Sequence, residues 1–313
     1  AVPELRKFNG KRKHGYLSYD ANGSDAMKLH KNYHLQMLIM ELTVTHTNGA
    51  APVFGDDGLY KIIRKMELIG DGNTQLRSVD GYKLKLDAIK YTGRSGKALE
   101  TLTTTASTAG LVSTIYIPVF FSMPKSVRPN DTILNGGLFS TLDLSVDWAN
   151  TTALGTDITI TDARMDVYSV ELWNHRRAKD EPITYWVQSM GRKEVMSTTA
   201  DFTLDLPDNK LYSNFTMVAY VDGVRDDSVI KSYIIKSGES VFHNWPNEIA
   251  KAYQHFNNEI SNDENLIGTV EANFSDRGRF SDALDIRRGS NYNGIDVILD
   301  VTKSGTKTEI VEY

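Results

Sequence analysis

A seven-residue pattern that occurs twice limits most strongly what this chain can fold into. Residues 142–148 read LDLSVDW and residues 295–301 read IDVILDV, with apolar side chains at positions one, three, five and seven. Aspartate stands at positions two and six of both segments. Successive side chains of a β-strand point to opposite faces, so this alternation predicts a strand with one buried and one solvated face. Each half of the chain therefore contains sheet with a dry side.

Two further pairs of segments extend this repeat. FGDDGLY at 54–60 resembles LPDNKLY at 206–212, and the Asp-Gly pair at 71–72 has a counterpart at 222–223. The offsets of the three pairs lie between 151 and 153 residues, close to half of the 313-residue chain. Because chains of this length usually form two cores rather than one, we predict two tandem domains of the same fold.

The repeat also sets the expected superposition and boundaries. Asp71 should lie over Asp222, and Asp143 over Asp296. A charged stretch that ends in proline suits a solvated linker between the copies. We place an N-terminal arm at 1–34, the first domain at 35–173, the linker at 174–182 and the second domain at 183–313.

Other alternating or apolar runs predict many more strands. Turn-forming pairs such as Asn48-Gly49 separate several of them. The run 115–121 contains Pro118, which suits an edge or a bulge better than a central strand. Many short strands at this spacing favour a sandwich or barrel over a parallel sheet. The expected strands cover 38–45, 59–69, 115–121, 138–148, 158–172, 183–190, 200–206, 214–221, 229–236, 267–274 and 295–301.

Two segments predict helices, one in each half of the chain. They cover 80–91 and 246–260. In the second segment, Ile249, Tyr253 and Phe256 fall on one helical face. We expect this face to lie against the outside of the barrel.

Basic residues are concentrated at the start of the chain, although the net charge is −5. The first 35 residues carry seven Lys/Arg and three Asp/Glu. A basic arm on an acidic body is typical of a tail that contacts an anionic partner, and a solvated terminus is the alternative. Residues 1–34 show no sustained period, so we expect them to order only against a neighbour or an anionic layer. The candidate contact residues are Arg6, Lys7, Lys11, Arg12 and Lys13.

Residue patterns that would support chemistry are scarce. The absence of cysteine excludes disulfides, thiolate metal ligands and a cysteine nucleophile. His30 and His34 have a metal-ligand spacing but no third ligand, and we interpret them as exposed polar residues. Residues 20–25 resemble the opening of a calcium loop but lack its glycine and glutamate, which favours a turn. Asp143 and Asp147 would stand about 13 Å apart along a strand, too far for paired glycosidase chemistry.

The sequence therefore predicts no catalytic site, no metal and no cofactor. No apolar run approaches the ~18 residues that span a bilayer, and the N-terminus lacks a signal-peptide core. We expect neither membrane insertion nor secretion by a standard signal.

Taken together, the tandem sandwiches with one helix each resemble the double jelly-roll major capsid proteins of tailless icosahedral viruses, among them bacteriophages with an internal membrane. The stretch from 59–60 through the turn at 71–72 to 80–82 resembles the strand-turn-strand-helix part of such proteins. The resemblance covers 35–313. It implies an all-β fold of two tandem eight-stranded jelly-roll barrels, each with a flanking helix, preceded by the basic arm.

The resemblance also implies a structural role and no enzyme activity. Three copies would form a homotrimer whose six barrels make a pseudo-hexameric capsomer, and capsomers would tile an icosahedral shell. The partners would be the chain itself, other virion proteins such as a vertex protein, and internal membrane lipid or genome. The basic residues of the arm would meet that lipid or genome on the inner face. The protein would be located in the virion after synthesis in the host cytoplasm.

Two other functions remain open on the residues alone. A carbohydrate-binding or glycan-hydrolysing double jelly-roll protein would expose aromatic rings beside convergent carboxylates. Trp173, Trp186 and Trp245 are candidate sugar platforms, whereas Trp148 ends an alternating strand on its apolar face and belongs to the core. A spike or appendage protein would share the fold without forming a lattice.

Overall fold

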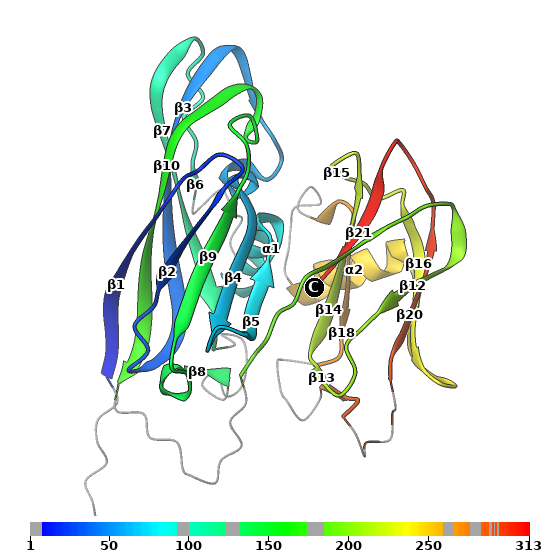
Figure 1. Ribbon diagram of the computed structural model, residues 1–313. Helices are drawn as coiled ribbons and strands as arrows, with labels where there is room; N and C mark the ends of the chain where they lie inside the picture. The colour runs from blue at the N-terminus through cyan, green and yellow to red at the C-terminus, as the bar shows by residue number, and fades with distance from the viewer. Residues whose placement is uncertain are drawn as a thin grey trace, which may run out of the picture. The chain divides into compact units, whose positions relative to one another are not determined.

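The chain folds into two units, drawn as ribbons in Figure 1 from a computed structural model. The structure describes residues 8–92, 100–122, 132–173, 185–258, 266–275, 283–287, 290, 292 and 294–313. Among these residues, the first unit ends at 189 and the second begins at 190. Each described unit consists mainly of antiparallel strands and has one α-helix.

Two antiparallel sheets form the first unit. Alternate residues of β9 are buried, and Leu144 and Trp148 have no exposed surface. The larger sheet has the order β1 (Phe8–Ser18), β10 (Gly155–Trp173), β3 (His34–Phe54), β7 (Thr108–Phe120) and β6 (Glu100–Thr101), with β8 (Leu134–Asn135) beside β3. The smaller sheet has the order β2 (Ser24–Lys28), β9 (Leu142–Trp148), β4 (Ile63–Gly70) and β5 (Thr74–Val79). The short helices η1 (Gly58–Ile62) and η4 (Gly136–Leu138) lie in connections, and α1 (Gly81–Thr92) follows β5.

The second unit repeats this arrangement with shorter strands around its own apolar core. One sheet has the order β11 (Gly191–Glu194), β21 (Thr308–Glu312), β14 (Asn214–Val221) and β15 (Val224–Arg225), with β18 (Thr269–Asn273) also paired to β14. The other has the order β12 (Thr199–Asp205), β20 (Asp296–Val301), β16 (Ile230–Ser237) and β17 (Ser240–Pro246). A small sheet joins β13 (Leu211–Tyr212) to β19 (Leu284–Asp285), and α2 (Asn247–Asn258) follows β17.

Four strands of each sheet correspond between the units, which confirms the predicted all-β fold of two eight-stranded jelly rolls with one helix each. In chain order the corresponding pairs are β1 and β11, β2 and β12, β3 and β14, β4 and β16, β5 and β17, β7 and β18, β9 and β20, and β10 and β21. Pro118 in β7 pairs with Ile39 on one side, and β6 reaches only as far as Ile115 on the other. The proline therefore stands at a local edge, as its missing N–H donor requires.

Pairing registers show which residues of the two units correspond. β4 pairs with β9 with a bulge after Ile63, and β16 pairs with β20 with a bulge after Ile230. The β4–β5 and β16–β17 pairs share a second bulge, after Leu68 and after Ile235. Both matches give an offset of 167 residues in β4, and opposite these strands β9 matches β20 at the predicted offset of 153.

The other two matches of the predicted repeat are wrong. The turn at 71–72 joins β4 to β5, whereas the turn at 222–223 joins β14 to β15, and β14 corresponds to β3. Likewise, 54–60 follows β3, whereas 206–212 precedes β14. Both Asp-Gly pairs have positive φ, 52° and 76° in the first turn and 49° and 83° in the second, as tight hairpin turns require. The segments share turn chemistry and not position.

The described part of the predicted arm is also not free. β1 pairs with β10 from Phe8 to Ser18, and β2 pairs with β9. The inward side of β1 carries Arg12 and His14 beside buried Leu17, and a bulge after Lys13 shifts the register. Backbone pairing with β10, and not apolar periodicity, therefore holds this strand, which is why its sequence resembles a loop.

Residues 185–189 belong to the first unit, whereas the sequence placed 183–190 in a strand of the second domain. Gln188 forms a single parallel bridge with Arg77. Its carbonyl accepts from Ser78 N at 2.8 Å, and its N–H donates to Leu76 O at 3.1 Å, so the segment lies along the outer edge of β5. The predicted linker at 174–182 lies outside the described residues.

Helix α2 packs through a different face from the one predicted. Ile249 and Tyr253 are 55% and 38% exposed, whereas Ala250 and Gln254 are buried. The small side chain of Ala250 lets the helix approach the barrel closely, which turns the larger residues outward. The side chain of Phe256 lies outside the described set.

Candidate functional site

The basic residues predicted to contact lipid or nucleic acid fall into two groups. Arg6 and Lys7 lie outside the described residues, and Lys11 is exposed on β1. Lys13 Nζ is 2.7 Å from Asp166 Oδ1 of the neighbouring strand. Hydrogen bonding to this carboxylate raises the pKa of Lys13. Lys13 is thus already paired within its own sheet.

Arg12 is held at the inward side of β1. Its Nε is 3.5 Å from Glu171 Oε1, and its guanidinium lies 5.4 Å from the centre of the Tyr33 ring. Glu171 is fully buried and also accepts a hydrogen bond from Ser169 at 2.9 Å. A buried carboxylate needs such partners, so Arg12 serves as a structural counter-charge.

Charged and aromatic side chains pair with one another on the outer face of the larger sheet. Arg164 makes two hydrogen bonds of 2.9 Å to Asp166, and it lies 4.0 Å from the centre of the Tyr16 ring. Lys13 lies 5.4 Å from the ring centre of Tyr168. Hydrogen bonds from Arg164, and then from Lys13, lower the pKa of Asp166. The network stabilises the β1–β10 pair and holds no unpaired acid or base.

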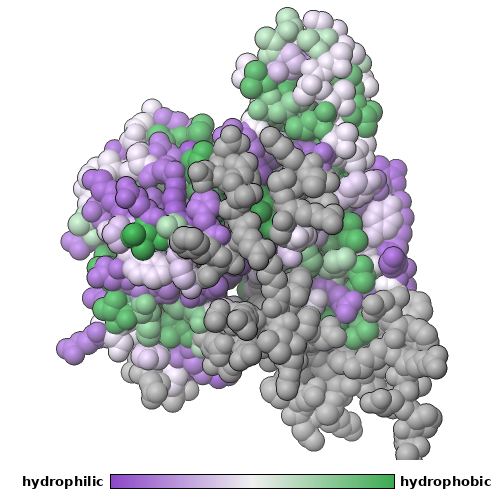
Figure 2. All heavy atoms as spheres, turned by 180° about the vertical axis from the view of Figure 1, so that it is seen from behind, coloured by the Kyte–Doolittle hydropathy of each residue, from purple (hydrophilic) through white to green (hydrophobic). Residues whose placement is uncertain are grey.

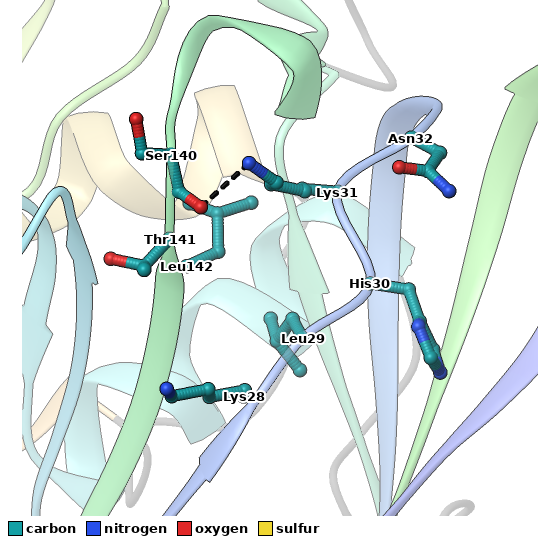
Figure 3. A pocket seen from close by; sticks show the side chains of 8 residues that line it. All are labelled: Lys28, Leu29, His30, Lys31, Asn32, Ser140, Thr141 and Leu142. Carbon is teal, nitrogen blue, oxygen red and sulfur yellow. Dashed lines mark hydrogen bonds between the residues drawn. The ribbon is translucent and has the colours of Figure 1, made fainter.

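A small open pocket of about 260 Å³ lies between residues 28–32 and 140–142 (Figure 3). Lys31 Nζ donates to the carbonyls of Phe139 at 2.9 Å and Ser140 at 2.6 Å. Figure 3 shows Lys31 extended toward Ser140, whereas the His30 ring points to the other side of its segment. The lysine fastens two segments together, and the pocket combines no acid, base and nucleophile.

The histidine pair differs from the one the sequence suggested. His30 stacks on His14, with ring centres 5.3 Å apart, and its N–H donates to His14 Nδ1 at 3.0 Å. Burial lowers the pKa of His14 to about 4. The described residues contain no cluster of three or more His, Asp or Glu side chains arranged to hold a metal. Residues 20–25 form the β1–β2 turn, in which Asp25 accepts hydrogen bonds from Ser18 N and Ala26 N.

One buried group has the bonding order of a hydrolytic triad. Ser113 Oγ is 2.9 Å from His46 Nε2, and His46 Nδ1 is 2.8 Å from Asn48 Oδ1. All three side chains lie in the barrel interior, at most 1% exposed. Asn48 also donates to the carbonyls of Thr103 and Thr105. Substrate has no access to such a group, so we interpret it as a network that fastens the 103–105 loop to the barrel.

The tryptophans do not form an open sugar platform in the described residues. Trp148 is fully buried, as predicted. The face of Trp186 is covered by the Arg77 guanidinium at 4.8 Å. Trp245 packs edge-on against Tyr253, with ring centres 5.0 Å apart. The side chain of Trp173 is outside the described set.

Arg77 is a buried residue that the sequence analysis missed. It has no exposed surface and lies between the rings of Phe121 and Trp186, 5.2 and 4.8 Å from their centres. Its guanidinium donates to the carbonyls of Leu76 at 2.9 Å, Phe120 at 3.0 Å and Trp186. Burial lowers its pKa to about 10. Its partners are distant in sequence, so no local pattern marks it.

Surfaces, and not a reactive centre, are thus the functional candidates. Figure 2 shows apolar residues at the tips of β3, β7 and β10, the upper end of the first unit in Figure 1. Val53 and Val112 are exposed there. In the described residues, no helix has the length and apolar character needed to cross a membrane.

Known structures with this fold are double jelly-roll capsid proteins of viruses. The MCP (major capsid protein) of STIV, the Sulfolobus turreted icosahedral virus, is 13% identical with a TM-score of 0.69, covering 99% of this chain and 96% of that chain. The major capsid protein P2 from bacteriophage PM2 is 10% identical with a TM-score of 0.57, covering 97% and 96%. The Faustovirus major capsid protein is 8% identical with a TM-score of 0.55, covering 100% and 90%.

These likenesses establish the double jelly-roll fold over the length of the chain. No protein-family model matches the sequence. No curated protein matches it either.

Proposed function

We propose that this chain is the major capsid protein of an icosahedral virus and that it has no enzyme activity. The observation that carries the proposal is the tandem pair of jelly rolls, which aligns with viral capsid proteins over 97–100% of this chain and 90–96% of theirs. A fold alone does not fix a function, but here both domains and their order match. The paired or buried state of the described reactive side chains agrees with a structural role.

The assembled form follows from the same fold. We infer a homotrimer with six barrels, in which the pseudo-hexameric outline lets capsomers tile a shell. The partners would be further copies and other virion proteins such as a vertex protein. The protein would be made in the host cytoplasm and located in the virion, and a bacteriophage is the host system we favour.

Electron microscopy of the purified protein tests this proposal. We expect trimers with a hexagonal outline, and flat or curved arrays when the protein is concentrated. Light scattering should give the trimer mass at micromolar concentrations. Isolated monomers under all conditions, together with binding on a glycan array, would favour the carbohydrate-binding alternative.

Contact of the basic N-terminal residues with inner-face lipid or genome stays a prediction. Lys13 and Arg12 have partners in β10, so the charge available in the described part of the chain rests mainly on Lys11. Replacing Lys7 and Lys11 with Gln should weaken co-sedimentation with anionic vesicles or nucleic acid at low salt. Lys28→Gln, an exposed lysine of β2, is the matched control. Equal binding by all three proteins would leave the charge as solvated surface.

A further inference from the structure

Corresponding sheet edges of the two jelly rolls differ in what covers them. In the first, β5 ends the smaller sheet, and Gln188 is bonded along its outer side to Leu76 and Ser78. In the second, β17 ends the corresponding sheet. Within the stretches that the structure describes, no segment pairs with the outer side of β17.

The correspondence extends from these strands into the helices. Opposite the matched strands β4 and β16, β5 matches β17 at an offset of 166 residues, so that Val79 corresponds to Trp245. The helices begin at Gly81 and Asn247, which is the same offset. Position for position, Lys83 therefore matches Ile249, and Asp87 matches Tyr253.

The two matched positions of α1 hold a buried ion pair. Lys83 Nζ lies 2.7 Å from Asp87 Oδ1. Gln188 Nε2 donates to the other carboxylate oxygen of Asp87 at 2.8 Å. The segment that covers the β5 edge therefore also covers this side of the helix.

The same two positions of α2 are apolar and open. Ile249 is 55% exposed and Tyr253 is 38% exposed, and they are neighbours one helical turn apart. Trp245, at the end of β17, packs edge-on against Tyr253 and extends this apolar surface toward the strand. Apolar side chains beside an unpaired strand edge are a feature of protein-binding surfaces. We name the outer edge of β17 with Trp245, Ile249 and Tyr253 the β17–α2 surface.

We propose that the β17–α2 surface binds a second copy of this chain, an inference that rests on the self-assembly proposed above. The matching surface of the first jelly roll is already covered by a segment of this chain that lies extended along the strand edge. That segment brings an aromatic residue, Trp186, whose ring lies 5.5 Å from that of Tyr91 in α1. Replacement of the ion pair by isoleucine and tyrosine indicates an apolar covering group in the second jelly roll. Aromatic and aliphatic side chains of this kind dominate binding energy at protein interfaces.

The test uses the full chain carrying Ile249→Glu and Tyr253→Glu together. The matched control is Val224→Glu, a 60% exposed residue of the same unit that lies on β15 outside the β17–α2 surface. In sedimentation velocity, wild type and the control should associate alike, and the double variant should associate roughly tenfold more weakly or worse. Equal association of the double variant would overturn this inference and leave self-assembly standing. A wild type that never associates would overturn both.

A second measurement does not depend on charged substitutions. The chain has no cysteine, so Ile249→Cys introduces a single thiol. Its labelling by a maleimide should slow markedly when the protein associates, whereas Val224→Cys should label equally fast in both states. Equal labelling of Ile249→Cys before and after association would overturn the proposal. Protection caused by another virion protein, and not by this chain alone, would do the same.

Discussion

In the first jelly roll the edge strand β5 is covered by Gln188 and its neighbours, whereas the corresponding strand β17 of the second has no partner on its outer side among the described residues. The offset of 166 residues places Arg77 of β5 opposite His243 of β17. Both side chains are packed among aromatic rings, but their bonding differs. Arg77 donates to three carbonyls, whereas His243 contacts the rings of Tyr233, Trp245 and Phe274.

This difference follows from what each edge must bind. A guanidinium has five N–H donors, so it suits a place where a second backbone segment brings carbonyl groups. An imidazole among aromatic rings gives packing with few hydrogen bonds. The same position of a duplicated fold is therefore used once to fasten the chain to itself and once to build an apolar surface.

Arg77→Met should have the largest effect on this comparison. It leaves the carbonyls of Phe120 and Trp186 without their donor in a buried place, which should lower the free energy of unfolding by about 3–5 kcal/mol. Urea denaturation measures the loss. The matched control His243→Met should cost clearly less, because His243 makes packing contacts in place of this bonding. Similar losses at both positions would contradict the distinction between a fastened edge and an open one.

Breaking the buried ion pair of α1 should have the next largest effect. Lys83→Met leaves the Asp87 carboxylate with Gln188 as its remaining side-chain donor, and should cost about 3 kcal/mol. The double change Lys83→Met with Asp87→Leu removes both charges and should recover part of the loss. The matching change Ile249→Met should be nearly neutral in the unassociated protein. A double variant less stable than Lys83→Met would show that the pair, and not its unpaired remainder, carries the stability.

The reliability of the sequence predictions depends on which interactions fix each element. The strand at 142–148 was predictable because its own side chains separate into buried and solvated faces. β1 was not, because pairing with β10 fixes it. The match of the Asp-Gly turns failed because any tight hairpin selects those residues, whereas the true correspondence depends on bulges that leave no sequence pattern. The Arg77 site joins residues 109 positions apart, from Arg77 to Trp186, and no local pattern predicts such a contact.

Backbone exchange gives a smaller effect that compares the two edges directly. Ser78 and Asn244 correspond, and Ser78 N donates to Gln188 O at 2.8 Å. In the unassociated protein, hydrogen exchange should therefore be slower at Ser78 than at Asn244. Association should slow exchange at Asn244 and leave Ser78 unchanged. Mass spectrometry of peptides that cover β5 and β17 measures both, and equal protection before association would contradict the comparison.

The smallest expected effect is a pH response at the matched position. Burial among aromatic rings disfavours the imidazolium and lowers the pKa of His243 from its ordinary value of 6.5. The unfolded chain then binds a proton near pH 6.5 while the folded chain does not, so stability is lost as the pH falls from 6.5 toward the folded pKa. Arg77 remains charged throughout this range and gives no such response. Urea unfolding of wild type and His243→Gln between pH 7 and 5 should show a smaller loss for the variant. His14 contributes with the same sign in both proteins and cancels in the difference, so parallel curves would mean that His243 titrates as it does in water.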